Sequence, residues 1–138
     1  MKTVYITRRE TFNAAHKLFR EDWTAEKNSE VFGNCSNQNW HGHNFTIYVT
    51  VKGIPNSDTG FVINLKDLSQ IIKDEVVEPL DHKNLNLEVP EFSDTIPTAE
   101  NIVVVIYNKL KKILTKEQRM EVVLYETPRN FVTYSENL

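Results

Sequence analysis

The residues best suited to chemistry lie in one short stretch, from Cys35 to Asn44. It contains the only cysteine of the chain and two of its four histidines, His41 and His43, within nine residues. His41 and His43 lead into residues 44–51, where apolar and polar side chains alternate as in a half-buried strand. Side chains two apart on a strand share a face and lie roughly 6.6 Å apart. The spacing therefore predicts that both imidazoles can bind one metal ion.

A pair of histidines on a strand is weak evidence by itself, because such residues are more often ordinary polar side chains. Cys35 strengthens the interpretation. It lies six residues before His41 in a loop of Ser, Asn and Gln, where a thiol can be a fourth metal ligand or a nucleophile or base beside the metal. The alternative is a small buried apolar residue, which the polar neighbours disfavour.

The other two histidines lie at the ends of expected elements. His16 ends a strand over residues 3–16, in which Val4 and Phe12 share its parity, and His82 follows Asp81 at the exit of a helix. Taken singly, each is more often a structural or exposed histidine than a functional one. His16 reaches the other two only if its strand pairs with the strand that follows His43.

Strands that could position these residues follow from the alternation of apolar and polar side chains. Turn residues between Gly53 and Gly60 predict a hairpin whose returning strand is short, and a turn near Pro128 predicts a second hairpin. The expected strands cover residues 3–16, 44–51, 61–63, 120–126 and 131–134.

Two helices are expected between the third and fourth strands. Asn64 is the predicted N-cap of the first, which Pro79 ends, and Thr98 is the predicted N-cap of the second, over residues 99–114. Residues 17–34 are polar and irregular and are interpreted as a long functional loop.

The element order is therefore β-β-β-α-α-β-β, without an internal repeat. Strands grouped at both ends of a chain favour an α+β fold with an antiparallel sheet. We expect four main strands plus one short strand, with two helices on one face, and a single domain over residues 1–138.

Composition excludes several function classes. A net charge of −3 gives no general attraction to nucleic acid, and 138 residues are too few for a TIM barrel. No apolar run approaches the roughly 20 residues that span a bilayer, and the first nine residues lack the apolar stretch expected of a signal peptide. With one cysteine, the chain suits a reducing compartment. We expect a soluble, cytoplasmic protein without a membrane partner.

Five motifs together resemble the 6-pyruvoyl tetrahydropterin synthase family, in the same order along the chain. They are Phe12-Asn-Ala-Ala-His16, Cys35-x5-His41-Gly-His43-Asn44, Pro79-Leu-Asp81-His82-Lys-Asn-Leu, Pro97-Thr-Ala-Glu100-Asn and Tyr125-Glu126-Thr. The resemblance implies the tunnelling fold (T-fold), in which three subunits close their sheets into a barrel and two trimers stack. A homohexamer with active sites at subunit interfaces is then expected. The implied substrate is a pterin, 7,8-dihydroneopterin triphosphate.

The resemblance also assigns roles residue by residue. His16, His41 and His43 match zinc ligands, Cys35 the catalytic thiol, Asp81 and His82 its charge-coupled partners, Glu126 the pterin anchor, and Thr98 and Glu100 the segment lining the pterin pocket. Ala99 stands where relatives often have a second threonine, which weakens the carry-over for that segment.

These residue types suit the implied reaction. Three imidazoles leave zinc an open position for substrate oxygens, where a Lewis acid makes adjacent C–H and O–H groups more acidic. Cys35 can remove a proton, and His82 oriented by Asp81 can supply or relay one. Glu126 can accept two hydrogen bonds from a pterin. Elimination of triphosphate with redistribution of two hydrogens would give 6-pyruvoyl tetrahydropterin.

Three alternatives remain open. One is 6-carboxy-5,6,7,8-tetrahydropterin synthase, a sister enzyme of the queuosine and deazapurine pathway that releases acetaldehyde. It usually has three residues between the cysteine and histidine, whereas five separate Cys35 from His41 here. Another is a non-catalytic zinc-binding module closed by Cys35 and three histidines. A cupin-like site is disfavoured, because no glutamate follows His43 at the required spacing. The expected product remains 6-pyruvoyl tetrahydropterin.

Overall fold

The longest strand pairing in the fold joins the two strands that carry the histidines. In a computed structural model that describes residues 2–136, β1 (Val4–His16) runs antiparallel to β2 (His41–Gly53). The register runs from Val4 opposite Gly53 to His16 opposite His41. The pairing that His16 needed to reach the other histidines is therefore formed.

The sheet has five strands in the order β3-β1-β2-β4-β5. β4 (Arg119–Tyr125) lies antiparallel to the other edge of β2, and β5 (Phe131–Tyr134) lies antiparallel to β4. β3 (Lys83–Asn84) pairs in parallel with the end of β1. The predicted α+β class and its four main antiparallel strands are confirmed, and the short fifth strand makes the sheet mixed.

The short strand predicted over residues 61–63 is wrong. This segment is a bend, and the short strand is β3, which follows the first long helix instead of preceding it. Both edges of β2 already carry partners, because Gly53 lies opposite Val4 and Lys52 lies opposite Arg119. A returning strand therefore has no free backbone groups on β2 to pair with. The structure orders the elements β-α-β-α-α-β-α-α-β-β when short α-helices are included.

The first long helix begins as predicted and ends one residue later. Asn64 caps α2 (Leu65–Ile72), and its Oδ1 accepts a hydrogen bond of 2.9 Å from the Lys66 N–H. The helix continues through a π-helical turn, Lys73–Val77, into α3 (Glu78–Leu80). Pro79 thus lies inside the helix, because the π-turn shifts the hydrogen-bond ladder just before it. The helix carries the chain directly to Asp81.

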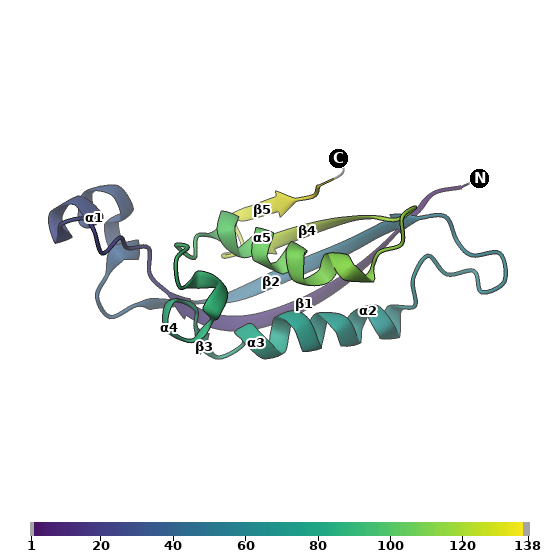
Figure 1. Ribbon diagram of the computed structural model, residues 1–138, viewed down its shortest axis with the longest axis horizontal. Helices are drawn as coiled ribbons and strands as arrows, with labels where there is room; N and C mark the ends of the chain where they lie inside the picture. Colours follow the sequence, from purple (N-terminus) through teal and green to yellow (C-terminus); the bar gives the residue numbers. More distant parts are fainter. Residues whose placement is uncertain (1, 137–138) are drawn as a thin grey trace.

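The second long helix, α5 (Ala99–Leu110), begins at the predicted cap, Thr98, and a 3-10 turn, Lys111–Ile113, completes it. Both long helices lie on one face of the sheet, with α2 and α3 along β1 and α5 across β2 and β4 (Figure 1). The predicted arrangement of the helices is confirmed.

The sequence suggested that the polar segment 17–34 is irregular, but part of it is helical in the structure. It contains α1 (Ala25–Phe32), which is followed by a 3-10 turn, Gly33–Ser36, that carries the cysteine. Only Asn28 of α1 is buried, so the helix has no apolar stripe that periodicity could reveal. Two further short helices, α4 (Leu85–Glu88) and a 3-10 turn, Pro90–Phe92, lie between β3 and α5.

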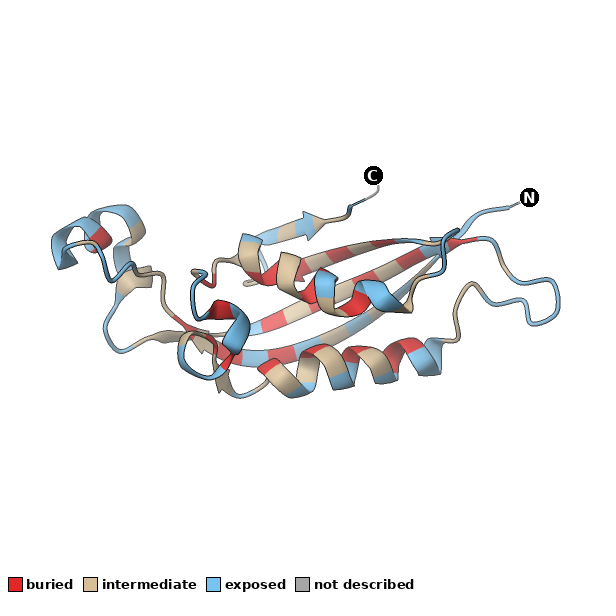
Figure 2. Ribbon diagram, in the orientation of Figure 1, coloured by how far each residue is buried: buried red, intermediate tan, exposed pale blue. Residues whose placement is uncertain are grey.

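The core lies between the inner face of the sheet and the two long helices, where red segments of strands and helices face one another (Figure 2). It is built from alternating residues of the strands and from the inward faces of the helices. Fully buried members include Phe45, Ile47, Val49, Val51, Leu68, Ile72, Ile102, Ile106, Val122 and Leu124. The histidines continue the same inward rows at one end of this core.

Among the described residues, no helix combines the length and apolar character needed to cross a membrane.

Candidate metal centre and active site

Three histidines meet at one end of the β1–β2 ladder. His16 lies opposite His41, and His43 lies opposite Ala14 on the same inward face. The nitrogens that face one another all lie within 4.8 Å of each other. His16 and His41 are the facing end residues of β1 and β2, and His43 lies two residues further along β2 on the same face. Alternation along β2 together with the β1–β2 pairing therefore brings the three rings together.

The converging nitrogens have no hydrogen-bond partner. Nε2 of His16, Nδ1 of His41 and Nε2 of His43 are buried and unpaired. Buried polar atoms in proteins are almost always hydrogen-bonded, so three orphan nitrogens aimed at one point require an additional group.

Burial keeps His16 and His41 neutral at neutral pH. The pKa of His16 falls to about 4, chiefly because burial disfavours the charged ring, and His41 and His43 lower it further against the opposing effect of a hydrogen bond to Pro97. The pKa of His41 is also lowered, first by burial and then by His43, although Glu126 opposes this. Neutral imidazoles present lone pairs, the form that binds metal ions.

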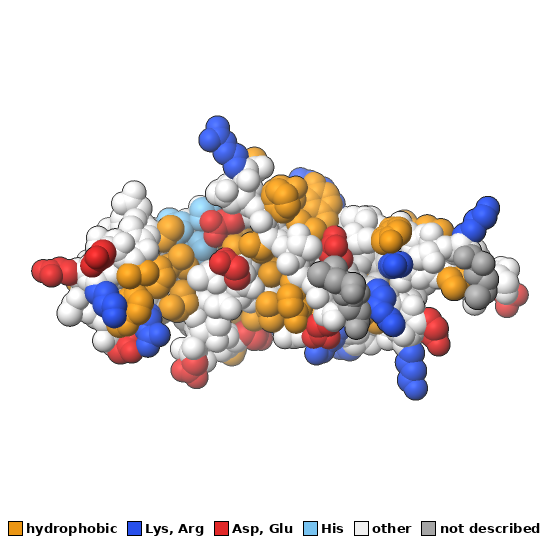
Figure 3. Space-filling model, turned by 90° about the horizontal axis from the view of Figure 1, so that it is seen from above, with side chains coloured by type: hydrophobic (Ala, Val, Ile, Leu, Met, Phe, Trp, Pro, Cys, Tyr) orange, Lys and Arg blue, Asp and Glu red, His pale blue; other side chains and the backbone are white. Residues whose placement is uncertain are grey.

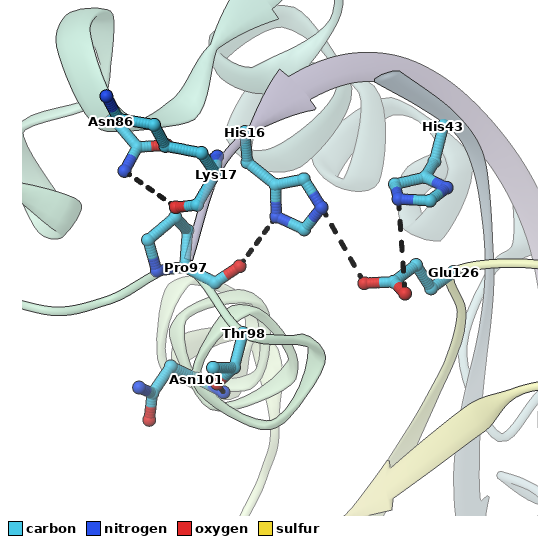
Figure 4. Close-up of polar contacts among 8 residues, drawn as sticks. All are labelled: His16, Lys17, His43, Asn86, Pro97, Thr98, Asn101 and Glu126. Atoms are coloured by element: carbon cyan, nitrogen blue, oxygen red, sulfur yellow. Dashed lines mark hydrogen bonds and ion pairs between the residues drawn. The ribbon is translucent and has the colours of Figure 1, made fainter. Parts of the chain in front are cut away.

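The carboxylate of Glu126 lies beside the same point. Its oxygens are 3.8 Å from Nε2 of His16 and 4.0 Å from Nε2 of His43 (Figure 4). Lone pairs of the neutral His16 ring and of a carboxylate repel one another unless a cation or a donor lies between them. The donor set of three imidazoles with a nearby carboxylate fits a zinc ion with an open position.

The second ring nitrogen of His16 has a fixed partner. Nδ1 of His16 donates to the Pro97 carbonyl over 2.8 Å, which sets the tautomer that leaves Nε2 unprotonated (Figure 4). Sequence reasoning placed Pro97 in a motif but missed the role of its carbonyl, because a backbone acceptor leaves no signature in the residue type.

Cys35 lies on the 3-10 turn Gly33–Ser36 and is a free, half-buried thiol. The Leu18 N–H donates to its carbonyl over 2.7 Å, which ties the loop to the chain just after His16. Within residues 2–136, the group that could hold a metal ion consists of the three histidines and does not include Cys35. The closed four-ligand site of a structural module is therefore not formed in this structure.

Asp81 and His82 form a second polar pair at the edge of β1. Oδ2 of Asp81 lies 2.8 Å from Nδ1 of His82, and Oδ1 accepts a hydrogen bond of 2.7 Å from the Asn13 N–H. The Asn13 hydrogen bond, followed by that from His82, holds the pKa of Asp81 below its ordinary value. The His82 side chain is 82% exposed, so the ring is oriented by Asp81 while its other nitrogen faces solvent.

Two non-glycine residues with positive φ, among those described, lie at these groups. They are Trp40, directly before His41, with φ of 66°, and His82, with φ of 59°. Such conformations are costly and concentrate at functional sites.

Thr98 and Glu100 lie at the start of α5. The Thr98 hydroxyl accepts the Asn101 N–H over 3.1 Å as the helix cap, and Glu100 is exposed in the first turn. Their predicted contact with a pterin stays a prediction.

Histidine atoms lie at the surface beside acidic side chains when the molecule is seen from above (Figure 3). A small molecule can therefore reach a histidine from this side.

Comparison with known proteins gives consistent similarities. The sequence pattern of the 6-pyruvoyl tetrahydropterin synthase family matches residues 5–137. The 6-pyruvoyl tetrahydrobiopterin synthase of Pongo abelii is 43% identical over 129 residues, covering 94% of this chain and 89% of that protein. The structure of Caenorhabditis elegans 6-pyruvoyl tetrahydropterin synthase aligns with a TM-score of 0.91 at 34% identity, covering 99% and 98%. The 6-carboxy-5,6,7,8-tetrahydropterin synthase of Bacillus subtilis is 30% identical over 113 residues, covering 76% and 73%.

Proposed function

Because the chain belongs to the 6-pyruvoyl tetrahydropterin synthase family, we propose that it is a lyase that converts 7,8-dihydroneopterin triphosphate into 6-pyruvoyl tetrahydropterin and triphosphate. The match over residues 5–137 supports a single catalytic domain. The observation that carries the proposal is the set of three orphan histidine nitrogens beside the Glu126 carboxylate.

We propose zinc as the metal, held by His16, His41 and His43, with Lewis-acid polarisation of the substrate side-chain oxygens as its contribution. Burial supports this assignment, because it keeps His16 and His41 in the neutral, ligating form. Their orientation on the inner face of the sheet leaves the side toward Glu126 for a substrate.

Proton transfer is assigned to Cys35 and to the Asp81–His82 pair. Cys35 as a thiolate removes a proton from the substrate side chain, and His82, held by Asp81 through Nδ1, supplies or relays a proton from Nε2. Two hydrogens move within the substrate, and the C–O bond to triphosphate breaks with its electron pair on the leaving group. No external oxidant or reductant is needed.

Recognition of the pterin is assigned to Glu126, with Thr98 and Glu100 as further lining residues. A carboxylate can accept two parallel hydrogen bonds from the 2-amino group and ring N–H of a pterin. Glu126 lies 3.8 Å from Nε2 of His16. A pterin ring bound to Glu126 would therefore place the side chain of the substrate beside the histidines.

Assembly into a homohexamer, a dimer of trimers, would complete the site at subunit interfaces. Apart from Ala14 and Ala15, which pair with β3, no described strand pairs with the outer edge of β1. An open edge of this length presents unpaired backbone groups that another chain can pair with. The exposure of His82 is consistent with a role in a neighbouring subunit's site. We propose the cytoplasm as the location, because the single cysteine suits a reducing compartment.

The alternative product is 6-carboxy-5,6,7,8-tetrahydropterin with acetaldehyde. Five residues separate Cys35 from His41, and this loop length favours the 6-pyruvoyl product, as does the greater identity to the Pongo abelii relative. Product analysis after incubation with 7,8-dihydroneopterin triphosphate tests the proposal. We expect triphosphate and 6-pyruvoyl tetrahydropterin in equal amounts. Acetaldehyde formed in step with substrate loss would select the alternative, and no turnover with zinc-loaded protein would reject both.

A further inference from the structure

We propose that Asn86 and Asn101 are positioning residues for the metal ligand His16, which they hold from two sides without touching its ring. The inference rests on the metal site of the proposed function. It concerns how the chain fixes one ligand before the metal binds.

Asn86 clamps the backbone next to His16. Its Oδ1 accepts the Lys17 N–H over 3.0 Å and its Nδ2 donates to the Lys17 carbonyl over 3.0 Å. β1 ends at His16, so Lys17 has no strand pairing of its own. The amide of Asn86 supplies both bonds that a neighbouring strand would have given. It thereby fixes the direction in which the chain leaves His16 (Figure 4).

Asn101 acts on the other side, through the turn before α5. Its Nδ2 donates to the Ile96 carbonyl over 2.9 Å, and its N–H donates to Oγ1 of Thr98 over 3.1 Å. The Thr98 N–H also donates to the Ile96 carbonyl, over 2.8 Å. These three bonds hold the Ile96–Thr98 turn in the shape that points the Pro97 carbonyl at Nδ1 of His16.

His16 is the ligand for which such support has the largest effect. Its side chain is 1% exposed, and among the described residues it alone of the three ligands has a hydrogen bond on its second ring nitrogen. As the last residue of β1, it has no strand pairing on its C-terminal side, where Asn86 holds Lys17 and the Cys35 carbonyl holds Leu18. Groups that orient a metal ligand typically change metal affinity by roughly 10–100-fold when removed.

Two variants remove the support without touching a ligand. Asn86→Ala removes both bonds to Lys17. Asn101→Asp cannot donate to Ile96, yet an acidic residue in the first turn of α5 suits the helix dipole, so this variant should fold. The matched control is Asn56→Ala, which loses two side-chain bonds to the Asp58 and Thr59 N–H groups. Asn56 lies in the loop beyond Gly53, at the opposite end of β2 from His41.

The experiment measures the zinc dissociation constant of metal-free protein by competition with a chromogenic chelator, together with the absorption spectrum of the Co²⁺ form. We expect the dissociation constant to rise roughly 10–100-fold in Asn86→Ala and Asn101→Asp and to stay within twofold in Asn56→Ala. The Co²⁺ spectrum should change in the first two variants only.

Zinc affinities within twofold of wild type in both variants, with an unchanged Co²⁺ spectrum, would overturn the inference. If either variant does not fold, the other decides, since Asn86 and Asn101 act on separate segments. A wild-type protein that binds no divalent metal would instead refute the proposed function. That result is seen before any variant is compared, so the two failures are distinguishable.

Discussion

The Glu126 carboxylate and Nε2 of His16 lie 3.8 Å apart, and burial lowers the pKa of His16 to about 4. At neutral pH this contact is therefore not an ion pair between a carboxylate and an imidazolium. Two electron-rich groups face each other, with a second histidine nitrogen 4.0 Å from the same carboxylate. The repulsion between them is relieved when a cation or the N–H groups of a substrate bind between them. Both kinds of ligand are consistent with the proposed function.

The first prediction concerns metal content. The purified protein should carry about one zinc per chain, and His41→Ala should lose it, because only two imidazoles then remain. Elemental analysis checks the ratio. Zinc should also raise the melting temperature of the wild-type protein, since a ligand that binds only the folded state stabilises it. Equal zinc content in wild type and His41→Ala would contradict the assignment.

The second prediction separates enzyme from structural module. Cys35→Ala should keep its zinc and its melting temperature and lose turnover by roughly 100-fold or more, as expected when a base is removed. Cys35→Ser keeps the size of the side chain while it removes the thiol. It is therefore the control for the change of volume in Cys35→Ala. Loss of zinc and of stability together in Cys35→Ala would mean that the thiol closes the metal site.

The third prediction concerns Glu126. Glu126→Gln should keep about one zinc per chain, because the three histidines suffice as ligands, while the KM for the pterin rises. A glutamine amide offers one acceptor where the carboxylate offers two, and each lost hydrogen bond to a charged group costs about 1.5–3 kcal/mol. Steady-state kinetics with parallel metal analysis provides the check. A zinc content that falls with the substitution would identify Glu126 as a fourth ligand.

The fourth prediction is a pH dependence of the metal-free protein. The pKa of His16 is about 4 in the folded state and near 6.5 in the unfolded state, so the unfolded state binds more protons between these values. The contribution of His16 to the free energy of unfolding is fully present above pH 6.5. It is lost as the pH drops towards 4, by up to about 3 kcal/mol.

Urea denaturation between pH 7 and pH 4.5 tests this dependence, with His16→Gln as the comparison. The lowered pKa of Asp81 affects stability only below its ordinary value of 3.8, outside this window. His16→Gln should therefore lose less stability than wild type over the same range. Parallel curves for the two proteins would disprove the effect.

The fifth prediction tests whether active sites are shared between subunits. Cys35→Ala and His82→Ala should each be inactive, yet co-expression should restore about a quarter of wild-type activity if each site takes Cys35 from one chain and His82 from another. Equal random mixing gives one intact site in four. Light scattering should find a homohexamer. No recovery in verified mixed oligomers would place both residues in the same chain's site.

Much of the histidine cluster could be predicted from the sequence. His41 and His43 precede a strand whose alternation is clear, and Phe12, Ala14 and His16 are buried on one face as their parity required. The caps Asn64 and Thr98 were also predictable, because a cap is a local hydrogen bond between residues two or three apart.

Other features depend on pairings between distant segments. The hairpin expected after β2 does not form, because β1 and β4 occupy both edges of that strand, and β3 pairs with β1 instead. α1 escaped notice because its contacts are made by polar groups such as Asn28.

The sequence by itself determined the residue types, their faces on the strands and, through five motifs, the resemblance to a family. Alternation and capping act over a few residues, so the chain states them directly. Only the tertiary structure decided that Glu126 faces His16, that the Pro97 carbonyl fixes its tautomer, and that Asn86 clamps Lys17. These contacts join residues 69–110 positions apart, and two of them use backbone atoms that every residue type carries. No local pattern can specify such a contact, because its geometry depends on how the sheet and helices pack together.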